Sequence, residues 1–312
     1  MSMYVADFHI HSRYSRATSR EMDLDSLPAW AQRKGIHLVG TGDFSHDLWY
    51  HTLRERLEPT GRHGIYSCRG TDFILTTEVC LLFEKANRLH RIHLLIFVPT
   101  IEGAGRLNRV LERYGSLESD GRPMLHLPAE DLVRAVEECD DGAFVVPAHI
   151  WTPHFSLFGS NSGFDAIEDC FGPFTDRIFC LETGLSSDPE MNWRLSALDR
   201  FSLISNSDAH SPNRLGREAN IFVEPFDFNE LRHILSHKDT SRFLMTIEYF
   251  PEEGKYHYDG HRTCGVRLSP EESRQRGGLC PSCGRRVTVG VLHRVADLAD
   301  RPAGFHPAGA VP

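Results

Sequence analysis

The chain has 312 residues, of which 40% are hydrophobic and 25% are charged. This is an ordinary globular composition, with enough length for one large domain or two smaller ones. No apolar run approaches the roughly 20 residues of a membrane span, and the N-terminus lacks the layout of a secretion signal, so we predict a cytoplasmic protein without a membrane partner.

The charge is unevenly distributed along the chain. The formal net charge of −9 argues against a nucleic-acid partner for the chain as a whole. Residues 255–312, however, contain nine Lys or Arg and five Asp or Glu, a formal excess of +4 that leaves −13 for the rest. A basic segment on an acidic body suits a polyanionic partner, although surface solvation explains the same counts. Carboxylates that bind metals also add to the negative count.

Short apolar segments alternate with amphipathic segments along the first 250 residues, which predicts an α/β fold with parallel strands. Around 251–254 this alternation stops, and we place a domain boundary there. The expected strands are residues 4–11, 36–40, 73–77, 92–99, 143–148, 178–181, 203–206 and 243–247. The expected helices are residues 24–34, 107–114, 129–138, 190–198 and 228–235.

The first expected strand ends in Asp7-Phe8-His9-Ile10-His11. Because side chains alternate along a strand, His9 and His11 lie on one face and can bind one metal ion. Two histidines near an N-terminus can equally have no role, so this motif alone decides nothing.

Further polar side chains recur at or within the later strands. In a β/α barrel the C-terminal ends of the strands share one face, where the chemistry takes place. Each residue has a simpler explanation, such as a helix N-cap or a surface loop, but seven such coincidences in chain order are hard to explain that way. The recurring residues are Asp43, Glu78, His93, His149, Glu182, Asp208 and His210.

The order of these motifs resembles the PHP (polymerase and histidinol phosphatase) superfamily of metal phosphoesterases, over residues 4 to about 250. The motifs are His9-x-His11, Thr41-Gly42-Asp43, Thr76-Thr77-Glu78, Ile92–Leu95, Ala148-His149 and Ser207-Asp208-Ala209-His210. The resemblance implies a distorted (β/α)7 barrel with two or three divalent ions.

The resemblance also implies how the ligands divide among the ions. One ion would be bound by His9, His11, Glu78 and Asp208, and a second by Glu78, His93 and His149. Asp43 and His210 would serve a third. Many family members have a histidine at the Asp43 position and a further histidine where this chain has Arg16, Ala17 and Thr18. The third ion is therefore the least supported of the three, and His46 is either an alternative ligand or a loop residue.

The ligand types suit Zn or Mn, and Mg is also compatible with the carboxylates. Closely spaced ions activate water and stabilise both the attacking and the leaving oxygen of an in-line displacement, which fits phosphate-ester hydrolysis. We name Asp208, His210 and Glu78 as candidate catalytic residues. For Asp208 and His210 the sequence leaves metal ligation and proton transfer both open.

The loop after the first strand is a candidate substrate contact. Arg13, Tyr14 and Arg16 follow His11, and arginine is well suited to phosphate oxygens. A solvated loop is the simpler alternative. Trp151 and Asn161 lie in loops after a later strand and could line a pocket for a base, or serve ordinary loop packing.

A cysteine-rich segment follows the expected boundary. His261-x2-Cys264 precedes Cys280-Pro281-Ser282-Cys283-Gly284, and two thiolates two residues apart before a glycine can hold one Zn in a tight turn. A redox pair or unliganded thiols are alternatives, and His257 is a rival to His261. We predict a structural zinc site of His261, Cys264, Cys280 and Cys283, because the segment is too short for a core of its own. The other five cysteines are interpreted as reduced core residues.

Two motif groups narrow the resemblance to the endonuclease Q family of DNA-repair nucleases, over essentially the whole chain. They are 7–15 with 40–44, and 255–264 with 280–286 and 290–295. This resemblance implies cleavage of damaged DNA on the 5′ side of uracil, hypoxanthine, xanthine or an abasic site. The basic module would hold the duplex, and the damaged nucleotide would be extruded towards the metals.

The expected organisation is a metal-dependent phosphoesterase barrel over 1–250, a zinc-binding module over 251–298 and a linker-like tail over 299–312. The resemblance implies that a helical region follows the tail, so we expect a shortened form or a fragment. Two other functions remain open: a phosphatase acting on a small phosphomonoester, and a non-catalytic nucleic-acid-binding protein with structural metals. The zinc module favours a macromolecular substrate, and the complete ligand set favours an enzyme.

Overall fold

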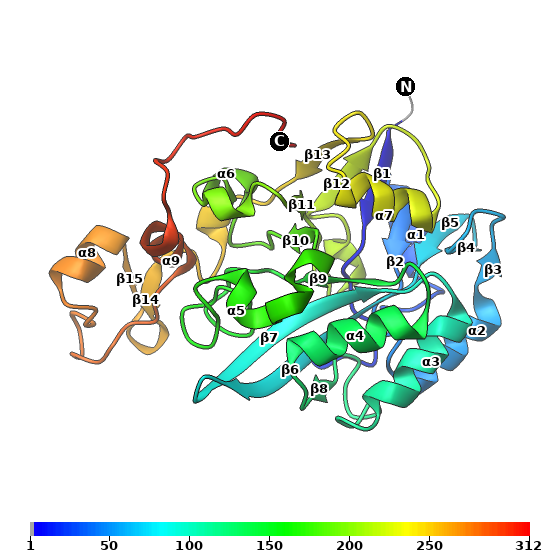
Figure 1. Ribbon diagram of the computed structural model, residues 1–312, viewed down its shortest axis with the longest axis horizontal. Helices are drawn as coiled ribbons and strands as arrows, with labels where there is room; N and C mark the ends of the chain where they lie inside the picture. The colour runs from blue at the N-terminus through cyan, green and yellow to red at the C-terminus, as the bar shows by residue number, and fades with distance from the viewer. Residues whose placement is uncertain (1–2) are drawn as a thin grey trace.

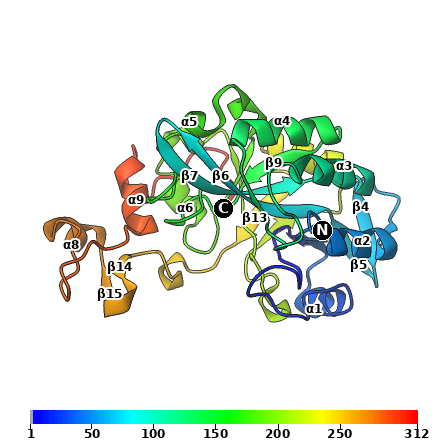
Figure 2. The same cartoon turned by 90° about the horizontal axis from the view of Figure 1, so that it is seen from below.

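A computed structural model describes residues 3–312 as a mixed α/β body with a small extension at one end (Figures 1 and 2). The body contains a seven-stranded sheet whose central strands β1, β2 and β5 are parallel, with antiparallel strands on either side. This central part carries His9 and His11 just beyond the end of β1. The order is β13 (Phe243–Ile247), β12 (Ala219–Phe222), β1 (Tyr4–Asp7), β2 (Leu38–Gly40), β5 (Thr71–Ile74), β4 (Ile65–Cys68) and β3 (Glu58–Pro59).

A second sheet is built on one long antiparallel hairpin, which corrects the expectation of parallel pairing here. Strands β6 (Thr76–Lys85) and β7 (Arg88–Phe97) pair along their whole length, so Glu78 and His93 lie inside the hairpin, not at two parallel strand ends. The turn residues Ala86 and Asn87 both have positive φ, as a tight hairpin turn requires. The sheet is completed by β8 (Met124–Leu125) beside β6 and β9 (Phe144–Pro147) beside β7.

The α/β prediction is confirmed, but the strands within residues 3–312 do not close into a barrel. Strands β10 (Cys180–Glu182) and β11 (Ser202–Ile204) form a separate parallel pair. Where β11 approaches the seven-stranded sheet, side-chain amides bridge the gap: Asn220 bonds both backbone groups of Ser205, and Asn206 accepts from the Phe8 N–H. Side-chain amides therefore replace part of the backbone pairing between β11 and the seven-stranded sheet.

Helices cover the outside of the sheets. The predicted helix at 24–34 begins later, at Leu27, and ends at Gly35, which has a φ of 71°. The helix expected at 190–198 is two short pieces, and a helix over Asp47–Arg56 was not predicted. The α-helices are α1 (Leu27–Lys34), α2 (Asp47–Arg56), α3 (Ile101–Leu111), α4 (Ala129–Cys139), α5 (Ile167–Phe171), α6 (Pro189–Asn192), α7 (Phe228–Ser236), α8 (Pro270–Gln275) and α9 (Val291–Leu298). Short 3-10 helices are η1 (Gly172–Arg177), η2 (Ser196–Leu198), η3 (Pro212–Arg214), η4 (Pro251–Glu253) and η5 (Arg262–Cys264).

The extension at one end of the body is the cysteine-rich segment, in which β14 (Asp259–His261) pairs with β15 (Val266–Leu268) and α8 follows (Figure 1). Its own buried cluster contains only Leu268, Cys280 and Val287. The next helix, α9, instead buries Val291 and Val295 in the main core of the body.

The C-terminal residues lie along the body and reach the edge strand β13 (Figure 1). Arg301 makes two hydrogen bonds to the Asp199 carboxylate, at 2.7 and 2.5 Å, and the Thr246 N–H donates to the Pro312 carbonyl. Across residues 3–312, no helix is both long and apolar enough to cross a membrane.

Candidate metal centre

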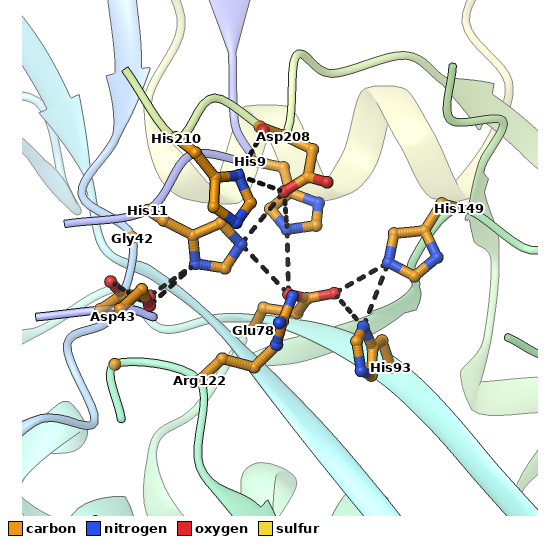
Figure 3. Close-up of polar contacts among 12 residues, drawn as sticks. His9, His11, Gly42, Asp43, Glu78, His93, Arg122, His149, Asp208 and His210 are labelled. Atoms are coloured by element: carbon orange, nitrogen blue, oxygen red, sulfur yellow. Dashed lines mark hydrogen bonds and ion pairs between the residues drawn. The ribbon is translucent and has the colours of Figure 1, made fainter. Parts of the chain in front are cut away.

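The site is organised around the segment that follows β1. Ile10 forms a parallel bridge with Ala209, and the His11 N–H donates to the Ala209 carbonyl. This pairing brings His9 and His11 against Asp208, and both imidazoles are fully buried. Two segments 200 residues apart in the chain thus supply one face of the site (Figure 3).

His9, His11 and Asp208 form the first group of possible metal ligands. Asp208 Oδ1 lies 3.8 Å from His9 Nε2 and 3.1 Å from His11 Nε2. All three atoms are buried and make no hydrogen bond within residues 3–312. Buried polar atoms are nearly always paired, so three converging unpaired atoms are the arrangement expected where a cation binds.

Glu78, His93 and His149 form the second group. Glu78 Oε1 lies 2.7 Å from His93 Nδ1 and 3.0 Å from His149 Nε2. Burial lowers the pKa of His93 to about 4, more than the neighbouring Glu78 raises it. His93 is therefore neutral at pH 7, the state in which an imidazole nitrogen can bind a metal.

Glu78 lies between the two groups (Figure 3). Its other oxygen, Oε2, lies 3.5 Å from His9 Nε2 and 3.2 Å from His11 Nε2. Burial would raise the pKa of Glu78, but the surrounding imidazoles and Arg122 outweigh it and hold that pKa well below its usual range. A buried carboxylate kept ionised between two groups of imidazoles can bridge two cations.

Asp43 lies beside His11 and belongs to neither group. Its Oδ1 is 2.9 Å from His11 Nδ1, while Oδ2 accepts from the Ser12 N–H, the Ser12 hydroxyl and the Ser15 hydroxyl at 2.6–2.8 Å. Both oxygens are thus occupied by hydrogen bonds. This geometry supports a role of Asp43 in orienting His11 more strongly than the role of metal ligand expected from the sequence.

Glu182 holds the His9 imidazole as Asp43 holds that of His11. The sequence marks Glu182 only as a polar residue at the end of an expected strand. Its Oε1 lies 2.9 Å from His9 Nδ1 and accepts from the Asn206 amide, while Oε2 accepts from the His149 N–H at 2.7 Å. Burial would lower the pKa of His9, but Glu182 and Glu78 raise it well above its ordinary value. A carboxylate at the end of an expected strand could have indicated that Glu182 belongs to the site. Its partner His9 could not be predicted, because the two residues are 173 positions apart.

Three site residues have strained backbones. Asp43, His149 and Asp208 have φ values of 47°, 32° and 46°, in the left-handed region that non-glycine residues rarely adopt. At Gly184 an added Cβ would lie 2.4 Å from the His149 Cβ, so only glycine lets these two segments approach. Such strain gathers at functional sites, where the surrounding structure maintains it.

His210 is half-buried next to His11, with ring centroids 4.5 Å apart, and its Nδ1 lies 2.9 Å from the Asp208 carbonyl oxygen. Burial lowers its pKa, with Asp208 acting in the opposite direction. It therefore borders the first group but shares no ligand position with it.

The three predicted substrate contacts in the loop after β1 have different partners in the structure. Arg13 is engaged by Asp23 and the Arg20 carbonyl, whereas the exposed Arg16 donates its backbone N–H to Asp120. Tyr14 stacks on the His46 ring, 4.4 Å between centroids.

The two later loop residues also differ. Trp151 is 1% exposed and its indole N–H donates to Asn192, so no face of its ring is open to a base, which corrects its prediction as a substrate contact. Asn161 is exposed and its amide lies 3.0 Å from the His154 ring.

Arg122 is in the site and was not predicted. It lies in the loop before β8 and its Nη1 donates to Glu78 Oε2 at 3.1 Å (Figure 3). Nothing in the sequence distinguishes it from the other arginines, because the loop contains no motif that fixes its position.

The cysteine cluster (His261, Cys264, Cys280 and Cys283) assembles as predicted, whereas His257 is buried elsewhere against the Ser186 carbonyl. His261 Nδ1 lies 3.3 Å from the Cys283 sulfur. Burial would raise the pKa of Cys280, but backbone N–H groups of Ser282 and Cys283 outweigh it and lower that pKa to about 6. Three sulfurs and one nitrogen are the ligand set of closed structural zinc sites.

Two clefts connect the site to the extension. A cleft of about 470 Å³ is lined by His149, Asp208, Arg217 and Tyr249. A second cleft, of about 450 Å³, is bordered by Tyr258 and the β14–β15 segment. Both clefts share the wall His154, Glu253, Gly254, Lys255 and Tyr256.

Comparisons with known proteins identify the kind of site. No family model matches the chain. It is 29% identical to the uncharacterised protein YqxK of Bacillus subtilis, over 96% of this chain and 78% of the relative, and 31% identical to the uncharacterised protein MJ0043 of Methanocaldococcus jannaschii, over 60% and 25%.

Two solved structures are similar over the whole chain. The lesion-specific endonuclease PfuEndoQ from Pyrococcus furiosus is 33% identical, with a TM-score of 0.85 and 74% of its chain covered. Endonuclease Q in complex with a 27-mer duplex substrate with an abasic lesion at the active site is also 33% identical, with a TM-score of 0.86 and 75% covered.

The fold and these matches assign the chain to the hydrolytic DNA nucleases that act in DNA repair. Within that class, the chain belongs to the endonuclease Q family. The family prediction and the enzyme prediction are therefore confirmed.

Proposed function

We propose that this protein is a metal-dependent endonuclease that hydrolyses the phosphodiester bond on the 5′ side of a deaminated base, such as uracil, hypoxanthine or xanthine, or of an abasic site. The observation that carries the proposal is Glu78, a buried carboxylate shared by two groups of imidazoles in a member of the endonuclease Q family. Relatives with 33% identity include one bound to duplex DNA with an abasic lesion.

The residues present fit two divalent ions, Zn, Mn or Mg. His9, His11 and Asp208 would hold one ion and His93 and His149 the other, with Glu78 between them. Bound ions supply Lewis-acid activation of water and neutralise charge on the phosphate. The chain's part is to keep the ligands oriented, with Asp43 held on His11 and Glu182 on His9.

His210 is the candidate proton-transfer group. Its imidazole is half-buried beside Asp208, and its lowered pKa keeps the ring neutral at pH 7, where it can accept a proton. A third ion held with Asp43 is less well supported, because both Asp43 oxygens already accept hydrogen bonds.

The damaged nucleotide would enter the cleft beside Asp208. Deaminated and abasic positions are easier to unpair than normal base pairs, which favours extrusion. Phe155 and Tyr256 line this cleft and offer aromatic faces for a base, while Arg214, Arg217 and Lys255 offer charges for the backbone. Trp151 is not part of this surface, since its ring is buried.

The zinc-binding module, 251–298, would hold the duplex by its phosphates. Arg262, Arg276, Arg285 and Arg286 are exposed on it, and its second cleft continues the wall of the first. We assign zinc to the cysteine cluster and the catalytic part to residues 1–250.

The test uses the full chain with Mn, Mg or Zn and labelled duplexes that carry one uracil, hypoxanthine or abasic site. We expect a nick 5′ to the lesion that leaves a 3′-hydroxyl and a 5′-phosphate, and no nick in the undamaged duplex. Rapid phosphate release from a small phosphomonoester without nicking would instead establish a phosphatase. DNA binding without either reaction would establish a non-catalytic binding protein.

A further inference from the structure

Arg122 is a positive charge placed inside the candidate metal centre. Its side chain is 27% exposed, and its Nη1 lies 3.1 Å from Glu78 Oε2, the oxygen that also faces His9 and His11. Figure 3 shows the guanidinium in front of Glu78, between the two groups of imidazoles. An arginine in this position is either a counter-charge for Glu78 or a contact for an anionic substrate.

The guanidinium has capacity for a further partner. It carries five N–H donors in a planar fork, and among residues 3–312 the side chain makes one hydrogen bond, to Glu78. Since the remaining donors are not enclosed by protein acceptors, they are free to bind an oxyanion. Arginine is the side chain best matched to phosphate, because its fork can bind two oxygens at once.

The loop that carries Arg122 is fixed in place. The Gly121 N–H donates to the Tyr14 carbonyl at 3.1 Å, its carbonyl accepts from the Ser45 hydroxyl, and the Arg122 N–H donates to Asp120. A Cβ at Gly121 would lie 2.4 Å from oxygens of Asp43 and Ser15, so the loop crosses the site at a distance only glycine allows.

We propose that Arg122 is a catalytic residue whose guanidinium binds a non-bridging oxygen of the scissile phosphodiester, an inference that rests on the proposed function. The contact positions the phosphate over Glu78 and neutralises the charge that develops on its oxygens during in-line displacement. Lysine cannot replace this fork geometry, although it keeps the charge.

The test compares Arg122→Lys and Arg122→Ala with Arg62→Lys and Arg62→Ala. Arg62 is the matched control, because it is also a partly buried arginine in an ion pair, with Asp72 at 2.5 Å, but far from the site. We expect Arg122→Lys to lower single-turnover nicking of a uracil duplex about a hundredfold, as losing one preorganised donor does. Duplex affinity and metal content should stay within about threefold of the unchanged protein, and added guanidinium should restore part of the Arg122→Ala rate.

Two results would overturn the inference. One is an Arg122→Lys protein that nicks at the unchanged rate, and the other is a loss of nicking that follows a loss of bound metal, which would make Arg122 a counter-charge. A separate calorimetric titration of inorganic phosphate into the Mn-loaded protein distinguishes failure of the inference from failure of the proposed function. If no duplex is nicked, a roughly tenfold weaker phosphate affinity in Arg122→Ala alone still supports the contact, and equal affinities in all variants reject it.

Discussion

The histidine–carboxylate site (His9, His11, Glu78, His93, His149 and Asp208) and the cysteine cluster are built in opposite ways. In the first, ligand atoms converge from distant strands of a large core, and further carboxylates hold two of the imidazoles in place. In the second, all ligands come from 23 consecutive positions, 261–283, around a core of three residues. We therefore expect the first site to form without its ions and the second to need a bound ion in order to fold.

This difference indicates which role a metal has at each place. A preformed site with strained ligands and an adjoining cleft suits chemistry on a substrate. A closed set of three sulfurs and one nitrogen on a small unit suits a structural ion, because such units are rarely stable without one. Removing ligands should therefore unfold one region and only inactivate the other.

The largest effect is expected from Cys280→Ser combined with Cys283→Ser. Structural zinc contributes on the order of 10 kcal/mol to the folding of such units, far more than the small core here can replace. We expect loss of one equivalent of zinc, new protease cleavage within 255–290, and an unchanged thermal transition of the body. The paired control is Cys68→Ser with Cys139→Ser, two buried thiols of the main core that should leave the zinc content unchanged. An intact, protease-resistant extension in the zinc-free double variant would contradict the comparison.

Asp208→Asn should have the largest effect on the histidine–carboxylate site without unfolding it. Asparagine tolerates the positive φ of Asp208 and has nearly the same shape, but it lacks the charge opposite His9 and His11. Since the loss of outer partners of metal ligands already costs about 10–100-fold, nicking should fall at least about a hundredfold. Circular dichroism and duplex binding should not change.

The control for this variant is Asp176→Asn, whose side chain is 92% exposed and distant from the ligands. It should nick at the unchanged rate. If Asp208→Asn also nicks at that rate, the assignment of the first ligand group is wrong.

Asp43→Asn and Glu182→Gln are expected to reduce metal affinity or nicking less than Asp208→Asn does. The difference would separate the metal ligands from the residues that only orient them. Each change keeps the shape but removes the charge that holds one imidazole through Nδ1. We expect a loss of about 10-fold to 100-fold in metal affinity or nicking rate, measured by metal titration and single-turnover kinetics. A loss from Asp43→Asn as large as that from Asp208→Asn would instead restore Asp43 as a ligand.

Much of the site could be predicted because its residues lie in short motifs with a definite order. His9 and His11 share a face by alternation, and the cysteine pair is recognisable from its spacing. The sequence does not indicate the hairpin that carries Glu78 and His93, because Ala86-Asn87 lacks the glycine that usually marks such a turn. Parallel and antiparallel strands of equal hydrophobicity look alike in sequence.

Other parts could not be predicted because they depend on three-dimensional contacts. Arg122 reaches Glu78 from an irregular loop, and Glu182 finds His9 from 173 positions away. The amides of Asn206 and Asn220 bridge β11 to the seven-stranded sheet, and no local pattern indicates these contacts. Trp151 was placed in a substrate loop, but its side chain turns into the core.

The smallest effect concerns a buried acidic pair outside both metal sites. Glu218 is fully buried, and burial with the nearby Glu248 raises its pKa well above the usual value. Burial likewise raises the pKa of Glu248 to about 7, although hydroxyls of Thr246, Ser205 and Thr183 lower it in part. The folded state therefore binds a proton that the unfolded chain releases near pH 4.5.

Because the folded state holds more protons between pH 4.5 and pH 7, the contribution of this pair to stability is complete below pH 4.5 and is lost as the pH rises through 7. Glu248→Gln keeps the shape of the side chain and removes the titration of Glu248, the member of the pair whose pKa is about 7. Between pH 5 and pH 8, we expect the free energy of unfolding to fall by about 1–3 kcal/mol less in the variant than in the unchanged protein. Urea unfolding at each pH measures this difference. Glu224→Gln is the control, since its side chain is 60% exposed. Equal pH profiles for Glu248→Gln and the unchanged protein would show that Glu248 does not bind a proton on folding.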